Sequence, residues 1–202
     1  MDAKERRRAQ WEEMMRQGIH AAVIEAITEY GVEGVTMDRV AQHAGVAKGT
    51  LYTYFANKQE LVRYAVTTSL EPLLEETTAI LTSDRPPLEK LEAATMAAVA
   101  YFEPNRALFR VFLYDRTMEK EPDHRSHFQA SSETLARVIE EGIADGTFRP
   151  VDALKVGSMI VEAHAALIRL RLAIDEPGAA EEDARLLLDV FLRGIAGPGA
   201  AS

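Results

Sequence analysis

Apolar residues recur at intervals of three and four along almost the whole chain, and strict alternation of apolar and polar residues is nearly absent. This spacing indicates amphipathic helices, so we predict an all-α fold of roughly nine helices. Glycines, prolines and short polar runs separate them. We expect a first helix ending at Gly31, then helices over about 37–44, 47–55, from 58 onward, 88–102, 106–118, 123–144, 151–174 and 180–196.

Capping signals support several of these boundaries. Thr36 is suited to cap the helix that follows it, and Asn57 to Glu60 has the pattern of a capping box. Pro72 lies inside the helical pattern that opens after Asn57, and proline removes a backbone donor. We therefore expect a kink or break at Pro72 that marks the boundary between two parts of the protein.

Residues 36–55 fit two short helices that cross at a tight turn. Val40 and Ala41 would face inward from the first helix, Gly45 would supply the turn, and Leu51 and Phe55 would anchor the second helix. A two-turn helix of this kind enters the major groove of B-DNA, which is ~12 Å wide. The opposite face of the second helix then presents short or hydrogen-bonding side chains: Lys48, Gly49, Thr50, Tyr52 and Thr53.

Aromatic residues favour a binding role for this face. A helical hairpin with a merely solvated polar face is the alternative, but such a face does not need Tyr52 and Tyr54 after Leu51 and Phe55 have served the core. Tyrosine hydroxyls, a capping threonine and a lysine at a helix start are groups that position a duplex through its phosphates. The pattern therefore indicates DNA binding.

Composition narrows the remaining classes. The chain has 202 residues and no cysteine, which excludes a disulfide framework, a cysteine-ligated zinc site and a thiol nucleophile. It shows neither an apolar run long enough to span a bilayer nor a signal peptide, so we expect a cytoplasmic protein that does not enter the membrane.

Net charge is −9, which at first argues against a nucleic-acid partner because phosphate affinity comes from Lys and Arg. The acidity is unevenly distributed. Residues 1–64 hold nine basic and nine acidic side chains, whereas residues 65–202 hold 14 basic and 23 acidic ones. The first part is thus neutral, with a basic stretch at Lys4 to Arg8 that we expect to be a frayed terminus rather than an additional DNA contact.

Residues 10–64 resemble the DNA-binding domain of TetR/AcrR-family transcriptional regulators, most specifically over the stretch Gly45 to Lys58. The resemblance implies a helix-turn-helix domain over 1–64, a helical ligand-binding and dimerisation domain over 65–202, and most often repression. It also implies base-edge contacts from Lys48, Gly49, Thr50 and Tyr52 and phosphate contacts from Thr36, Tyr54 and Lys58. Thr53 shares the same face. Many relatives have serine where this chain has Ala47, so the recognition helix is expected to have a weak N-terminal cap.

The acidic second part predicts dimerisation and effector binding. The last two helices are apolar over a wide arc that one small domain cannot cover, so we expect a homodimer that pairs them in a four-helix bundle. Methionine and aromatic side chains suit an adaptable pocket for a small apolar or amphipathic effector, although a plain core is the alternative. The candidates are Met96, Phe102, Phe109, Phe112, Met118, Phe128, Met159 and His164.

Two other classes stay open at this point. One is a helical ligand-binding or interaction protein without DNA binding. The other is a metal-dependent enzyme, since His124 and His127 lie three apart on one helix face. No catalytic site is completed around either histidine and no phosphate-binding glycine loop occurs, so we expect a non-enzymatic protein with no metal and no cofactor.

Overall fold

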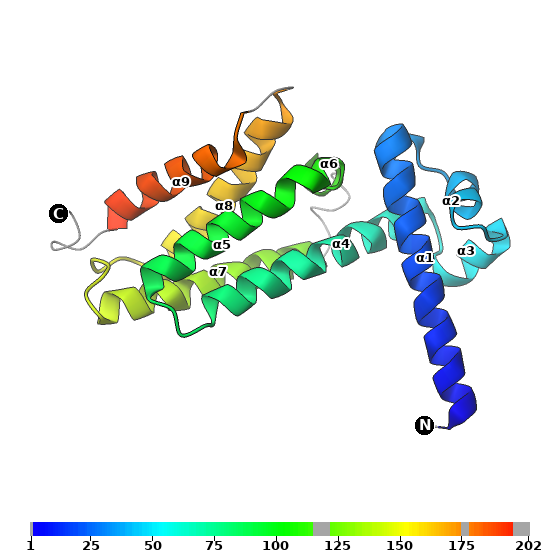
Figure 1. Ribbon diagram of the computed structural model, residues 1–202, viewed down its shortest axis with the longest axis horizontal. Coiled ribbons are helices and arrows are strands. Elements are labelled where there is room, and N and C mark those ends of the chain that lie inside the picture. Colours follow the sequence, from blue (N-terminus) through cyan, green and yellow to red (C-terminus); the bar gives the residue numbers. More distant parts are fainter. Residues whose placement is uncertain (1, 115–121, 175–177, 196–202) are drawn as a thin grey trace. The chain divides into compact units, whose positions relative to one another are not determined.

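The computed structural model describes residues 2–114, 122–174 and 178–195, and every regular element in these ranges is helical (Figure 1). The all-α prediction is confirmed. In chain order the helices are α1 (Ala3–Gly34), α2 (Met37–His43), α3 (Lys48–Tyr54), α4 (Lys58–Leu81), α5 (Pro87–Phe102), the 3-10 turn η1 (Glu103–Asn105), α6 (Arg106–Tyr114), α7 (Pro122–Ala144), α8 (Ala153–Leu172) and α9 (Ala180–Ile195).

The chain divides into two compact units, Met1–Leu70 and Glu71–Ser202. The division lies two residues before Pro72, whereas the sequence placed the boundary between residues 64 and 65. Helix α4 contributes its first half to one unit and its second half to the other. It runs through Pro72 as one continuous helix, so the helix does not break there.

The first unit is a small helical domain with its own core. Helix α1 packs on α2, and α2 packs on α3. Apolar side chains from all four helices close the interior: Ile19, Val23, Val40, Leu51, Leu61 and Val66 are almost completely buried. Helix α1 is interrupted at Gly31, where φ is 68° and ψ is 167°, which is a backbone conformation that favours glycine. The predicted end of the regular helix at Gly31 thus appears as a kink, followed by one more short turn.

The second unit is a bundle in which α5 contacts α7, α8 and α9, and α7 contacts α8 most extensively (Figure 1). Gly157 explains the close approach of α7 and α8. A Cβ atom at this position would lie 2.7 Å from the carbonyl oxygen of Ser132 and 3.1 Å from the amide of Ala136, so only glycine fits. Val138 and Ile139 of α7 form the centre of the core there.

The N-terminal residues differ from expectation. Residues 3–10 are helical rather than frayed, because Asp2 forms a capping box with Glu5. The Asp2 side chain accepts hydrogen bonds from the amides of Lys4 and Glu5 at 2.6 and 2.8 Å, and the Glu5 carboxylate accepts one from the amide of Asp2 at 2.7 Å. These bonds satisfy amide groups that a helix start otherwise leaves unpaired.

Candidate nucleic-acid interface

Helices α2 and α3 form a tight corner. The Thr36 hydroxyl accepts a hydrogen bond from the amide of Arg39 at 3.2 Å, as the cap prediction required. Gly45 has φ of 66°, and the amide of Val46 donates to the carbonyl oxygen of Ala41 at 3.0 Å. These local bonds fix the angle at which α3 leaves the turn.

Helix α3 has one buried side and one open side. Leu51 within the helix and Phe55 just after it point into the core, with 0% and 3% of their surfaces exposed. Lys48, Gly49, Tyr52 and Thr53 are exposed, and Thr50 is half-buried. Tyr52 leaves 51% of its surface open although it is a large aromatic residue. The residues predicted for base contacts therefore share one accessible face of the helix.

Charged and polar groups of this face already have internal partners. The Lys48 Nζ atom lies 2.8 Å from Oδ2 of Asp38 on α2, and both side chains are exposed. The hydrogen bond to Asp38 is the main cause that raises the pKa of Lys48 above its ordinary value, so this lysine is fully charged near neutral pH. The Thr53 hydroxyl donates to the carbonyl oxygen of Thr50 at 2.6 Å. Any new contact by Lys48 therefore competes with Asp38.

The start of α3 lacks a side-chain cap, in agreement with the prediction from Ala47. Ala47 has extended backbone angles suitable for a cap residue, but its methyl group cannot accept a hydrogen bond. The amide groups of the first turn thus depend on water or on an external acceptor such as a phosphate oxygen.

The residues proposed for phosphate contacts lie at the edges of this face. Thr36 is exposed at the start of α2, and half-buried Tyr54 lies at the end of α3. Lys58 begins α4 and donates from Nζ to the carbonyl oxygen of Glu33 at 3.2 Å. Asn57 caps α4 by accepting from the amide of Glu60 at 2.8 Å, but the Glu60 carboxylate bonds to the amide of Ala56 rather than to that of Asn57. One of the two bonds of the predicted capping box is therefore present, and the return bond from Glu60 goes to the preceding amide.

Two arginines of the first unit were not singled out from the sequence. The Arg16 guanidinium lies 5.8 Å from the centre of the Tyr54 ring and 5.9 Å from that of Tyr64. Arg39 stacks over Tyr30 at 4.4 Å and donates to the carbonyl oxygen of Gly34. Both pairs join residues from different helices, so the spacing within one helix could not have shown them.

The candidate effector residues fall into separate groups in the second unit. Phe102 and Phe109 are buried and meet edge to face at 5.5 Å, and Phe109 meets Phe112 at 6.5 Å. Met96 packs against a small apolar cluster around Val99. Phe128 is half-buried on α7.

Two of the candidates do not join these groups. Met159 is 58% exposed on α8, so it faces outward in the isolated chain. Met118 lies outside the described residues.

His164 occupies a polar position between α8 and α5. Its Nδ1 lies 2.8 Å from the carbonyl oxygen of Ile160, and its Nε2 lies 3.2 Å from the Thr95 hydroxyl. A carbonyl only accepts, so Nδ1 carries the proton and Nε2 accepts from Thr95 when the ring is neutral. Burial lowers the pKa of His164, and the bond to Ile160 opposes this only partly. The ring is therefore neutral near pH 7.

Arg171, which the sequence did not suggest, ties the ends of three elements together. Its side chain is 3% exposed and pairs with Glu103 of η1 at 2.6 Å and with Asp183 of α9. It also donates to the carbonyl oxygen of Gly178 at 3.0 Å. These contacts hold η1 and the start of α9 against the C-terminal end of α8.

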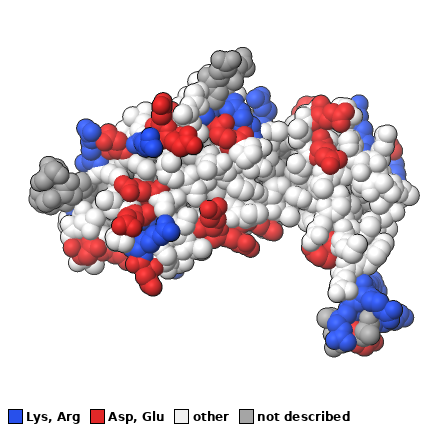
Figure 2. Space-filling model, viewed as in Figure 1, with Lys and Arg blue, Asp and Glu red and all other residues white. Residues whose placement is uncertain are grey.

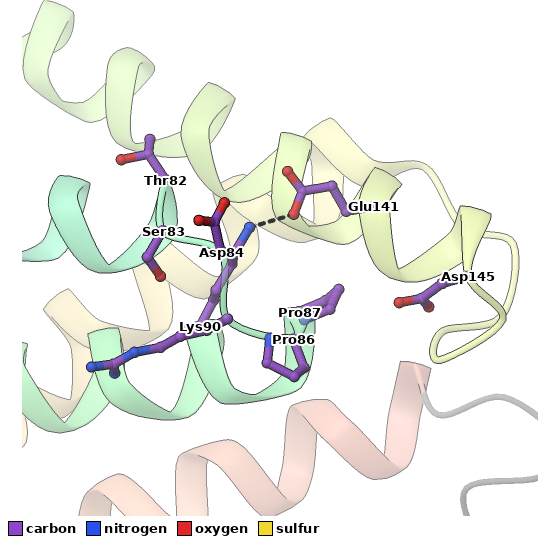
Figure 3. A pocket seen from close by; sticks show the side chains of 9 residues that line it. Thr82, Ser83, Asp84, Pro86, Pro87, Lys90, Glu141 and Asp145 are labelled. Carbon is purple, nitrogen blue, oxygen red and sulfur yellow. Dashed lines mark hydrogen bonds and ion pairs between the residues drawn. The ribbon is translucent and has the colours of Figure 1, made fainter.

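An open, surface-exposed cavity of about 580 Å³ lies between the α4–α5 connection and α7 (Figure 3). Its walls are mainly polar, and across it Lys90, which is 5% exposed, donates to Glu141 of α7 at 2.6 Å. Its lining residues are Thr82, Ser83, Asp84, Arg85, Pro86, Pro87, Lys90, Glu141 and Asp145. This cavity therefore differs in place and in chemistry from the apolar effector site predicted from the sequence.

The described part of the chain gives no evidence of a metal site or of a membrane-spanning helix. Within it, no three His, Asp or Glu side chains gather as a metal site would require. The His124 side chain, half of the candidate histidine pair, lies outside the described residues. Among the described helices none is long and apolar enough to cross a bilayer.

Comparison with known proteins gives matches in both units. Residues 19–65 match the model of bacterial regulatory proteins of the tetR family, and residues 84–169 match a tetracyclin repressor-like C-terminal domain. YhgD of Bacillus subtilis, an uncharacterized HTH-type transcriptional regulator, is 27% identical over 73% of this chain and 78% of its own length. The HTH-type transcriptional repressor KstR2 of Mycolicibacterium smegmatis is 28% identical over 59% of this chain and 60% of its own length. The solved structure of the TetR family transcriptional regulator PfmR from Thermus thermophilus superimposes with a TM-score of 0.70 at 27% identity, covering 87% of this chain and 97% of that one.

Proposed function

Because the chain belongs to the TetR family of bacterial transcriptional regulators, we propose that it is a repressor that binds a palindromic operator as a homodimer and is released by a small effector. The chain is a ligand-responsive, DNA-binding regulator. The observation that supports the DNA-binding role most directly is helix α3, whose Leu51 is buried in the core while Lys48 and Tyr52 stand open on the other face. Action on chromosomal DNA requires the bacterial cytoplasm, and this role needs no catalysis.

We assign sequence reading to the open face of α3. Lys48, Gly49, Thr50 and Tyr52 would approach base edges in the major groove, where each base pair presents a distinct pattern of donors and acceptors. Thr53 would support the edge of this contact. Thr36, Tyr54 and Lys58 would hold the two sides of the groove through phosphates, which sets orientation without reading sequence. The uncapped amides at the start of α3 offer a further phosphate contact.

Homodimerisation is supported by an apolar surface on the last two helices. Met159 and Leu170 of α8 and Leu186 and Val190 of α9 each leave more than half of their surface exposed. A two-fold axis through α8 and α9 would bury these side chains and create a four-helix bundle. The same axis would set two copies of α3 on half-sites ~34–36 Å apart. Two DNA-binding domains are needed because one neutral domain makes few phosphate contacts on its own.

Effector binding is proposed for the apolar interior between α5, α6 and α8. Phe109 and Phe112 offer apolar contact there, and the neutral His164 with Thr95 offers one adjustable polar contact. These groups suit an apolar or amphipathic molecule. An effector that binds more tightly to the conformation with misplaced recognition helices weakens DNA binding, and linkage requires DNA to weaken effector binding equally.

Helix α4 is the proposed connection between the two activities, because it belongs to both units and carries Pro72 near their division. Proline leaves one backbone carbonyl of the preceding turn without its helical donor, which makes this part of α4 the easiest to bend. Hydrogen exchange measured with and without effector should change over residues 58–80. Unchanged exchange in this segment would remove α4 from the proposal.

Selection of bound genomic fragments tests the function itself. We expect the wild-type protein to enrich a palindromic sequence, with binding that weakens as salt increases. Tyr52→Ala should lose at least tenfold in affinity for that sequence while sedimentation shows an unchanged dimer, and Tyr52→Phe, which keeps the ring, should lose less. Fragments recovered without sequence preference, and binding that is independent of salt, would contradict the regulator assignment.

A further inference from the structure

The first turns of α1 extend beyond the packed part of the first unit. Ile19 is the first residue of α1 that is fully buried, and residues 4–11 are all exposed. The helix nevertheless begins at Ala3, because the Asp2–Glu5 capping box closes its first turn. Residues 3–18 thus form a helical segment about 24 Å long at 1.5 Å per residue. We call this segment the N-terminal arm.

The arm carries a dense positive charge at its tip. Lys4, Arg6, Arg7 and Arg8 supply four cations within five residues, and Figure 2 shows Lys and Arg side chains gathered at this end of the chain. The acidic Asp2 and Glu5 are held in the capping box. Successive helical residues point ~100° apart, so the four cations project in different directions around the helix.

The arm also lies beside the proposed reading helix. Arg16 approaches the ring of Tyr54, the last residue of α3, at 5.8 Å. About two turns closer to the tip, Arg8 pairs with Glu12 at 2.8 Å. The pKa of Arg8 is raised above its ordinary value mainly by the hydrogen bond to Glu12 and by the charge of the same carboxylate. Arg16 therefore places one cation of the arm against the phosphate-contacting edge of α3, about two turns from the cations of the tip.

We propose that the N-terminal arm is a second, sequence-independent contact with the phosphate backbone of operator DNA, outside the helix-turn-helix. This inference rests on the proposed function, because it takes the operator as its occupant. From Lys4 to Arg16 the arm covers about 18 Å, which corresponds to roughly five phosphates of one strand at 3.4 Å per nucleotide. In a two-fold dimer the contact occurs twice.

Charge and sidedness favour DNA over an anionic membrane. A membrane-surface helix separates a basic face from an apolar face. In the arm, the cations surround the tip, where residues 4–10 include no large apolar side chain, and Trp11 and Met15 belong to the stripe that enters the core at Ile19. Contact with a duplex needs no such separation, because each arginine can reach a phosphate independently.

A salt titration of operator binding tests the proposal. The test variant is Arg6→Ala/Arg7→Ala/Arg8→Ala, and the control Arg85→Ala/Arg137→Ala/Lys155→Ala removes the same charge from exposed positions of the second unit. If the variant loses one phosphate contact per arm, the dimer loses two, and the slope of log K against log salt should become less steep by ~1.8. If the two proteins bind equally at 1 M salt, the variant should then bind about 60-fold more weakly than the wild type at 0.1 M. The ratio of operator to nonspecific affinity should stay constant, whereas Tyr52→Ala should reduce it.

The outcomes separate the arm from the regulator assignment. Wild-type binding with equal slopes for the arm variant and the control variant overturns the arm contact and leaves the proposed function intact. A wild-type protein that binds no operator overturns both. Circular dichroism should show equal helix content in all variants, since alanine preserves helix propensity.

Trp11 supplies an independent readout, because it is the single tryptophan of the chain and is 54% exposed on the arm. Operator DNA should reduce the quenching of its fluorescence by neutral acrylamide, and this protection should be lost in the arm variant. Protection by vesicles of anionic lipid but not by operator would overturn the assignment to DNA.

Discussion

Asp38 is predicted to restrain DNA binding by holding Lys48 in an internal ion pair. Lys48 Nζ and Asp38 Oδ2 lie 2.8 Å apart, and the side chains are 47% and 71% exposed. In Asp38→Asn the lysine keeps its position at the start of α3 but loses its competing carboxylate. Operator affinity should therefore increase.

The size of the effect follows from the exposure of the pair. Exposed pairs of this kind hold their partners by a factor of about two, so two pairs in a dimer give about fourfold tighter binding. Removing two carboxylates beside the phosphates adds to this at low salt and fades as salt increases. Asparagine is nearly isosteric with aspartate, so the first turn of α2 should remain capped by Thr36.

Fluorescence anisotropy with a labelled operator at several salt concentrations measures both parts. The matched background is Lys48→Ala, in which Asp38→Asn should have only the salt-dependent effect of the lost carboxylate. Equal affinity of Asp38→Asn and wild type, or the same gain in the presence and absence of Lys48, would show that the pair does not compete with DNA.

Three further predictions concern the second unit and the arm. Gly157→Ala should lower the free energy of unfolding by about 2 kcal/mol, because the new Cβ atom meets the backbone of α7. Gly18→Ala should raise it by about 0.5 kcal/mol, because nothing lies within 4 Å of a Cβ atom there and alanine favours the helix. Urea unfolding measures both changes. Glu141→Ala should lower the free energy of unfolding by about 2 kcal/mol, because it leaves the buried Lys90 without its ion-pair partner. Lys90→Met should lower it less, because the remaining Glu141 carboxylate is half-exposed and can be hydrated. A larger loss of stability in Lys90→Met than in Glu141→Ala would contradict this asymmetry. The pKa of His164 is lowered in the folded state, so the unfolded chain takes up a proton at a higher pH than the folded chain does. The free energy of unfolding should therefore decrease as pH falls from about 6.5 towards the folded pKa. His164→Gln should remove this part of the pH dependence of unfolding.

The first unit could be predicted closely because local signals determine it. The cap at Thr36, the positive φ of Gly45 and the buried pair Leu51 and Phe55 are each encoded within a few residues of the chain. The absence of a cap at Ala47 followed from one side chain. The N-terminus differs from the frayed end expected at Lys4 to Arg8, because Asp2 and Glu5 act together as a cap.

The effector region could not be predicted to the same depth, because apolar spacing does not distinguish a core from a pocket or from an interface. Phe102 and Met159 satisfy the same helical pattern, yet Phe102 is fully buried and Met159 is mostly exposed. Arg171 shows the converse case: a charged residue that the pattern assigns to the surface is buried because Glu103 of η1 and Asp183 of α9 reach it from other elements. Such partners depend on tertiary packing, which the period of a single helix does not contain.

The charge of the first unit gains a physical meaning from its ion pairs. Its acidic side chains balance its basic ones in number, and in the structure several of them are engaged: Glu12 holds Arg8, Asp38 holds Lys48, and Asp2 and Glu5 close the N-terminal cap. For Arg8 and Lys48, the proposed DNA contacts would be an exchange in which phosphates replace carboxylates as partners of the same cations. Because such an exchange gains less than a contact with a cation that has no carboxylate partner, one DNA-binding domain would bind weakly, and the proposed dimer would compensate with two linked domains and two arms. For Lys48 the pair also favours release, since a small displacement of α3 from the DNA would return this lysine to Asp38, which is already within reach.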